Sequence, residues 1–251
     1  MIQITCDCGP VFEAESEEAL VQVMRRHVDE AHADLGLSDQ SVRDYVAAAV
    51  RSGPPKPRVE RLGSVEVRAL TPERRDDFLS FFDYEAFAGN PAWADCYCMF
   101  FYFPPKDLAW GQRAAAENRS ASAERIDCGE MGGYLAYVDG QPAGWCNAGP
   151  RQMYARIAQA EDRRVDDEEQ IGSIVCFVIA PQYRRHGLAR RLLDAAVEGF
   201  RREGLSIAEA YPARGAESDA DNYYGPASLY AAAGFAPFRE IEGHTMVRRT
   251  I

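Results

Sequence analysis

The chain has 251 residues, enough for one large domain and one small one, and 47% of them are hydrophobic, as in ordinary globular proteins. No apolar run approaches the roughly 20 residues of a membrane span, and the N-terminus lacks the basic and apolar regions of a secretory signal, so we predict a cytoplasmic protein that neither crosses nor binds a membrane. With 28 basic and 39 acidic residues the net charge is −11, which argues against a nucleic-acid partner and favours cationic substrates such as amines.

The seven cysteines are odd in number and widely scattered, unlike the dense disulfide framework of a small secreted domain. We therefore predict free thiols or metal ligands. They are Cys6, Cys8, Cys96, Cys98, Cys128, Cys146 and Cys176.

Residues 1–52 are predicted to form a small separate domain. Residues 1–55 hold 4 basic and 10 acidic residues, a stronger acidic bias than in the rest of the chain. Two short strands, 2–5 and 11–14, flank a turn, and Ser16 and Ser38 are placed to cap two following helices. A proline-rich linker over 53–63 then leads to a second domain over 64–251.

The small domain carries two cysteines and two histidines in a pattern that suggests a zinc site. Cys6 and Cys8 lie in the turn, and His27 and His32 lie on the first helix. Such a set could hold one structural zinc ion, although zinc fingers usually space their cysteines more widely. Two thiols in a turn and two ordinary helix histidines remain the alternative. The segment also resembles a small bacterial domain family of unknown function, the DUF1059 type, which implies no activity.

The larger domain is predicted to alternate strands and helices around a mixed sheet with helices on both faces. An aromatic-rich segment, residues 84–110, lacks the periodicity of a helix or strand. Its side chains could either line a small-molecule pocket or pack on one another. The predicted elements are, in chain order, a strand at 64–69, a helix from Thr71 to about Asp83, a hairpin of 132–138 and 143–148, a surface connection at 151–170, a strand at 174–179, a helix from about 188, a strand at 206–211, a polar loop at 212–224 and a helix from Ala227.

A strand, a basic loop and a helix follow one another between Ile174 and Gly204, in the order required for an anion site. The start of the helix offers unpaired backbone N–H groups and the positive end of the helix dipole. Gly187 lets a ligand approach the backbone, and Arg184 and Arg185 add charge-assisted donors. We predict that a phosphate group binds here.

The motif Arg184-x-x-Gly187-x-Ala189 resembles the acetyl-CoA diphosphate loop of the GCN5-related N-acetyltransferase (GNAT) family, and residues 225–235, with Leu-Tyr-x-x-x-Gly-Phe, resemble the late helix of the family. The resemblance implies a GNAT-like α/β (α+β) fold over residues 64–251, acetyl-CoA as cofactor, and direct movement of the acetyl group from the thioester to an amine. The residues it implies for cofactor binding are Cys176, Phe177, Val178, Arg184, Arg185, His186, Gly187, Leu188 and Ala189.

The catalytic residues are less well specified. By resemblance Tyr230 is the general acid for the leaving thiolate, with a buried core tyrosine as the alternative. Glu209, on the strand beside the cofactor site, is our first candidate for the general base, and the carboxylates bordering the aromatic segment are further candidates. These are Asp83, Glu85 and Asp95. Cys176 invites an acyl-cysteine mechanism, but it has no activating histidine at hand and packing is the simpler interpretation.

Two functions therefore remain open. The first is an N-acetyltransferase whose acceptor is a small-molecule or protein amine. The second is a non-catalytic protein that uses the same fold to bind coenzyme A or to sense metals or thiols. The sequence leaves the acceptor and a homodimeric assembly undecided.

Overall fold

The computed structural model describes residues 1–6, 8–54, 56–88, 90–105, 110, 113–216, 218 and 221–251. Parts of the predicted linker, aromatic segment and polar loop, at residues 55, 89, 106–109, 217, 219 and 220, lie outside this range. The predicted thiols are confirmed, since all seven cysteines are free. Within the described chain, no helix combines the length and the apolar composition that crossing a membrane would require.

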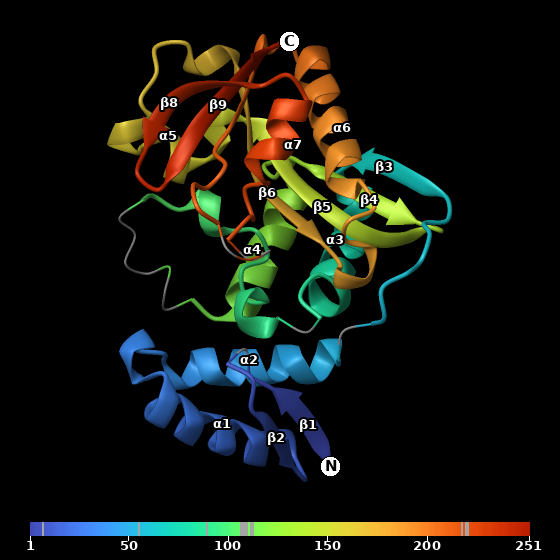
Figure 1. Cartoon of the computed structure of the whole chain (residues 1–251), viewed down its shortest axis with the longest axis vertical. Helices are drawn as coiled ribbons and strands as arrows, with labels where there is room; N and C mark the ends of the chain where they lie inside the picture. Colours follow the sequence, from blue (N-terminus) through green and yellow to red (C-terminus); the bar gives the residue numbers. More distant parts are fainter. Residues whose placement is uncertain are drawn as a thin grey trace.

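An N-terminal unit, residues 1–52, lies at one end of the molecule (Figure 1). Strands β1 (Ile2–Thr5) and β2 (Val11–Ala14) pair antiparallel, and helices α1 (Glu17–Ala31) and α2 (Asp39–Ser52) pack against each other. The Ser16 and Ser38 hydroxyls accept from the backbone N–H groups of Ala19 and Ser41, which caps both helices. The unit buries a small core of its own, formed by Ile4, Cys6, Leu20, Val21, Met24, Val28, Val42 and Val46.

The rest of the chain is built on one seven-stranded sheet with the order β3-β4-β5-β6-β7-β9-β8. Only β6 and β7 run parallel; the other neighbours are antiparallel. The strands are β3 (Val65–Ala69), β4 (Tyr134–Val138), β5 (Gln141–Pro150), β6 (Ile171–Ile179), β7 (Ile207–Ala210), β8 (Ala236–Ile241) and β9 (His244–Thr250).

Helices cover both faces of this sheet, which confirms the predicted mixed α/β architecture (Figure 1). On one face, α6 (Leu188–Arg202) packs on β4, β5 and β6 through Leu192, Leu193 and Phe200, and α7 (Ala227–Ala232) joins the same core. The opposite face holds α3 (Arg75–Ser80), the π-helical turn η3 (Phe81–Glu85), α4 (Ala115–Asp127) and α5 (Ala155–Ala158). Short 3₁₀ turns make up the connections: η1 (Ala33–Leu35), η2 (Pro72–Arg74), η4 (Pro91–Trp93), η5 (Phe100–Tyr102), η7 (Arg151–Met153), η8 (Glu161–Arg163), η9 (Glu168–Gln170) and η10 (Pro181–Tyr183).

Three features differ from the sequence-based expectation. Helix α4 and the final hairpin β8–β9 were not predicted. The stretch 151–170, expected to be a surface connection, places Arg151, Tyr154 and Ile157 in the interior, where none is more than 1% exposed. Arg151 can be buried because its guanidinium bonds Glu209 and two backbone carbonyls.

Helix α2 joins the N-terminal unit to the rest of the molecule. It contacts η3 and η4, the turns that begin the aromatic segment. The Arg51 guanidinium donates to the Asp83 carbonyl (3.1 Å), and an Asp44 carboxylate oxygen accepts from the N–H of Ala115, the first residue of α4 (2.9 Å). The N-terminal unit therefore touches the layer that covers the sheet.

Candidate functional site

The central feature of the site is the separation of strands β6 and β7. Their parallel pairing ends at Ile174 and Ala210, while β6 continues to Ile179 in pairing with β5 alone. On the side that β7 leaves, the N–H of Phe177 donates to the carbonyl of Tyr223 (2.6 Å). The second half of β6 thus faces a gap between two strands of one sheet.

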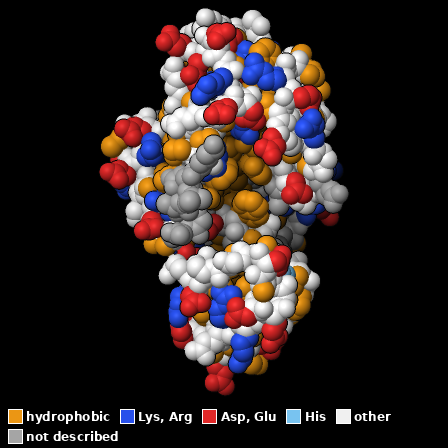
Figure 2. Space-filling view, turned by 90° about the vertical axis from the view of Figure 1, so that its left-hand side faces the viewer, with side chains coloured by type: hydrophobic (Ala, Val, Ile, Leu, Met, Phe, Trp, Pro, Cys, Tyr) orange, Lys and Arg blue, Asp and Glu red, His pale blue; other side chains and the backbone are white. Residues whose placement is uncertain are grey.

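A cavity of about 900 Å³ opens along this half of β6. Its wall includes Cys176, Phe177, Val178 and Ile179 from β6, the start of α6, and aromatic residues of the covering segment such as Phe87, Trp93 and Phe101. The hollowed face in Figure 2 shows hydrophobic side chains gathered there, above the N-terminal unit. The volume and the apolar lining suit a large organic ligand.

The start of α6 borders the cavity with backbone donors and cations. Gly187 precedes the helix with a φ of 80°, and nothing lies within 4 Å of the place where its Cβ would be. The first N–H groups of an α-helix have no partner within the helix and attract anions. Arg184, Arg185 and Arg190 line the same wall, together with Leu188 and Ala189. This end of the cavity is suited to a diphosphate.

His186 does not line the cavity with its neighbours in the loop. Its Nε2 lies 3.0 Å from the carbonyl oxygen of Val59, and the residue is not part of the cavity wall. It holds the segment before β3 against the loop. His186 therefore fixes the loop, and its predicted contact with the cofactor stays a prediction.

Tyr230 is completely buried, and its hydroxyl donates to the carbonyl of Tyr224. Burial raises its pKa well above the ordinary value, so the phenol keeps its proton. The hydroxyl lies directly behind Gly225, a residue of the cavity wall, at 3.1 Å from the place a Cβ would take there. Tyr223, which the sequence did not single out, lines the cavity itself.

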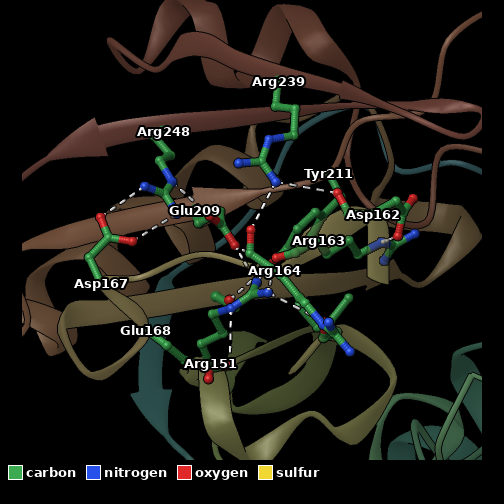
Figure 3. Close-up of polar contacts among 12 residues, drawn as sticks. Arg151, Asp162, Arg163, Arg164, Asp167, Glu168, Glu209, Tyr211, Arg239 and Arg248 are labelled. Atoms are coloured by element: carbon green, nitrogen blue, oxygen red, sulfur yellow. Dashed lines mark hydrogen bonds and ion pairs between the residues drawn. The ribbon is translucent and has the colours of Figure 1, made fainter. Parts of the chain in front are cut away.

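Glu209 lies away from the cavity, in a buried ion network (Figure 3). Its two carboxylate oxygens accept from Arg151 (2.6 Å) and from Arg248 (2.7 Å), and Tyr211 also donates to it. A carboxylate occupied by two guanidinium groups and remote from the ligand wall is badly placed to accept a proton from a substrate. Glu209 therefore links β7 to β9 through its ion pair with Arg248.

Asp95 is the one carboxylate among the described residues that line the cavity. Burial, and then the nearby charge of Asp44, raise its pKa to about 6. The other two candidates are occupied elsewhere. Asp83 accepts from Tyr97 and Arg119; although its burial acts the other way, these groups keep its pKa below the ordinary value. Glu85 pairs with Lys56 and accepts from Gln182 (2.8 Å).

The N-terminal unit brings its two cysteines and two histidines together. The ligand atoms of Cys6, Cys8, His27 and His32 all lie within 4.8 Å of one another. Cys8 Sγ is 3.3 Å from His27 Nε2, and Cys6 Sγ is 3.7 Å from His32 Nε2. Ligand atoms of a tetrahedral zinc site stand about 3.3 to 3.8 Å apart, from the usual Zn–N and Zn–S lengths. The donor set and these two distances fit such an ion.

Solved structures of acetyltransferases are similar to this chain at low sequence identity. An N-acetyltransferase (PaiA) from Thermoplasma acidophilum in complex with coenzyme A is 13% identical, with a TM-score of 0.44 over 75% of this chain and 99% of its own. A ribosomal-protein-alanine N-acetyltransferase from Brucella melitensis is 16% identical (0.45; 74% and 99%). The GNAT domain of S. lividans PAT is 15% identical (0.48; 75% and 92%).

No protein of curated function matches the chain. The resemblance of residues 1–50 to the DUF1059 type stays a prediction. The acetyltransferase (GNAT) family, by contrast, matches residues 102–224, a range that holds strands β4 to β7 and all of α6. Residues 102–224 of this chain are therefore similar to the acetyltransferase (GNAT) family.

Proposed function

We propose that the protein is an acetyl-CoA-dependent N-acetyltransferase that acetylates an amine in the cavity beside β6. The observation that carries this proposal is the junction of the separated strand β6 with the start of α6, where one cavity meets both an apolar wall and a set of anion donors. We assign residues 1–52 to a small N-terminal domain, 53–63 to a linker and 64–251 to the catalytic domain.

Acetyl-CoA has a charged diphosphate and an apolar pantetheine arm, and the cavity wall offers groups suited to each. Backbone N–H groups at the start of α6, with Arg184 and Arg185, would hold the diphosphate. The apolar residues of β6 would flank the pantetheine arm. When bound, the thioester supplies an activated acetyl group and a thiolate leaving group.

The acceptor end needs a group that removes a proton from the amine. Asp95 meets this need, because it is the cavity carboxylate and its pKa of about 6 lies near working pH. Tyr230 is retained as the proposed acid for the leaving thiolate. Its raised pKa keeps the phenol protonated, and its hydroxyl lies just behind the wall at Gly225.

The test is release of free coenzyme A from acetyl-CoA by the purified full chain across a panel of small amines and peptide N-termini, with product masses recorded. We expect at least one amine to gain an acetyl group in step with thiol release. Tight binding of acetyl-CoA without an acetylated product from any amine would favour the non-catalytic alternative.

We further propose that Cys6, Cys8, His27 and His32 hold one structural zinc ion. The support is the closeness of the four ligand atoms and the size of the core, since a unit of about 50 residues buries little apolar surface on its own. Four protein ligands would leave no open position for a reacting water. The site would thus stabilise the N-terminal domain and take no direct part in the chemistry of acetyl transfer.

A further inference from the structure

We propose that Cys98 is a nucleophile that receives the acetyl group from acetyl-CoA before the amine does. This inference rests on the proposed function and concerns the same cavity, but it changes the route. Family resemblance implies direct transfer, whereas a group of side chains around Cys98 gives this chain the means for two successive transfers.

Cys98 lines the cavity, and its sulfur is surrounded by hydrogen-bond donors. Trp145 Nε1 and Asn147 Nδ2 each lie 3.2 Å from it. The Cys176 side chain, on β6, is the third group that bonds this sulfur, and the raised pKa of Cys176 makes its thiol the donor of the pair. Three donors converging on one sulfur stabilise a thiolate in the way that an oxyanion hole stabilises an alkoxide.

The direction of these hydrogen bonds is set by their surroundings. The indole N–H of Trp145 can only donate, so the sulfur must accept. The amide of Asn147 is oriented because its oxygen lies 2.8 Å from the Tyr154 hydroxyl and 3.5 Å from that of Tyr102. Its NH₂ group is thereby turned toward Cys98, whose carbonyl it also approaches (3.4 Å).

The backbone around Cys98 holds the sulfur in place at a cost in strain. Tyr97 and Cys98 have φ values of 41° and 57°, in the left-handed region that residues other than glycine rarely adopt. Tyr97 is kept there by its hydroxyl, which donates to Asp83 (2.6 Å), and Asp83 is bonded in turn to Arg119. Strain of this kind is retained where the surroundings impose it, and it gathers at functional sites.

The neighbouring thiols differ from Cys98 in their ionisation. Burial is the largest influence on Cys98 and acts to raise its pKa, but the three hydrogen bonds outweigh it and the pKa is lowered. The pKa of Cys176 is raised well above its usual value, first because its thiol donates to Cys98. Burial raises the pKa of Cys96, also in the wall, to about 12. Cys98 is therefore the thiol of this group that ionises most readily.

Each half of the reaction then balances. The Cys98 thiolate attacks the thioester carbon, the bond to the coenzyme A sulfur breaks, and the released thiolate takes a proton from the acid. The neutral amine next attacks the acetyl-cysteine, and as the carbon–nitrogen bond forms, the proton that the nitrogen gives up passes to Asp95 and from there restores the acid. The carbon–sulfur bond to Cys98 breaks, the acetylated amine leaves, and the sulfur returns as a thiolate among its three donors.

The test is intact-mass measurement of the full chain after acid quenching of a reaction with acetyl-CoA and no amine. We expect a gain of one acetyl group, mapped by peptide analysis to Cys98, and its loss when an accepted amine is added. Cys98→Ser should form no such thioester and should lower turnover by on the order of 10²-fold or more. Cys96→Ala, at the same wall, should keep the adduct.

A second measurement applies even if Cys98→Ser folds poorly. In the wild-type chain, alkylation of Cys98 by iodoacetamide should begin at lower pH than that of Cys96, and Cys176→Ala should move the Cys98 profile to higher pH. The proposal is overturned if a chain that acetylates amines never carries an acetyl group on Cys98, or if Cys98→Ser retains full turnover. Either result leaves the proposed acetyltransferase intact, whereas absence of any acetylated amine would refute that function itself.

Discussion

Gly187 is the residue on which cofactor binding most depends. Its φ of 80° and the open space around it leave room for a diphosphate. Gly187→Val would place a branched side chain there, and we expect acetyl-CoA binding to be lost. Gly187→Ala is the matched control: its single methyl meets no atom, so it should cost about 1–2 kcal/mol of stability through the backbone strain alone and weaken binding less. Calorimetric titration of acetyl-CoA checks both, and unchanged affinity in Gly187→Val would remove the diphosphate from this loop.

A second prediction concerns the hydroxyl of Tyr230. Tyr230→Phe deletes the hydroxyl behind Gly225 and keeps the ring, so acetyl-CoA affinity should hold while turnover falls by roughly 10² to 10⁴. Tyr223→Phe, in the cavity wall, is the comparison and should lower turnover much less. Steady-state rates with a thiol reagent measure both. The reverse order of effects would transfer the role of acid to Tyr223.

Single residues were predictable from the sequence only where a local motif fixed them. Gly187 and the arginines belong to such a motif, and the structure places them at the cavity. The partners of Glu209 could not be foreseen, because Arg151 lies 58 positions away and the bond exists only through the fold. Cys98 is surrounded by Trp145, Asn147 and Cys176, and nothing in the sequence marks those residues as its neighbours.

At the scale of elements, helix α2 brings Asp44 close to Asp95. The charge of Asp44 is one cause of the raised Asp95 pKa, so Asp44→Asn should lower that pKa. If Asp95 is the base, kcat/KM rises with pH through about 6, and in Asp44→Asn this limb should move to lower pH. The asparagine oxygen can still accept from Ala115, which keeps the cap on α4.

The control for this prediction is Asp95→Asn, which should remove the limb. It should also be more stable than wild type at pH 7: a carboxyl whose folded pKa is raised stabilises the fold when protonated, and this contribution is lost as the pH rises through about 6. A pH profile that Asp44→Asn leaves unmoved would separate Asp95 from the reaction.

Most elements followed from periodicity and capping, and those that were missed lack these signals. Helix α4 turns Asn118, Ser122 and Ile126 to the interior, so its buried face is largely polar and has no apolar stripe to find. Strand β8 is an edge strand that contains Pro237 and buries only Ile241, so it shows no alternation. Both are held by tertiary packing.

The proposed zinc ion links metal binding to the folding of the N-terminal domain. Stoichiometric zinc should be present in freshly purified protein and absent from Cys6→Ser/Cys8→Ser. Because metal binding would be part of the folding energy, chelation should unfold residues 1–52. Cys128→Ser, an exposed cysteine outside the cluster, is the control and should retain the metal. Zinc that survives the double substitution would leave the four residues without a metal role.

The contact between α2 and the covering segment adds a consequence for catalysis. Since Arg51 bonds Asp83, the residue next to Phe82 of the cavity wall, chelation should raise KM for the amine more than it affects acetyl-CoA binding. The sequence predicted two units and a linker, but not this contact, which joins positions far apart in the chain.

The central claim is that an acetyl group passes from acetyl-CoA to an amine within this cavity. The most direct measurement follows the label of acetyl-labelled acetyl-CoA in the full-length protein with an accepted amine, counting released thiol and labelled product in the same quenched samples. We expect one labelled amine for each thiol released, and loss of this transfer in Gly187→Val. Label that remains on coenzyme A, or that appears only as free acetate, would contradict it.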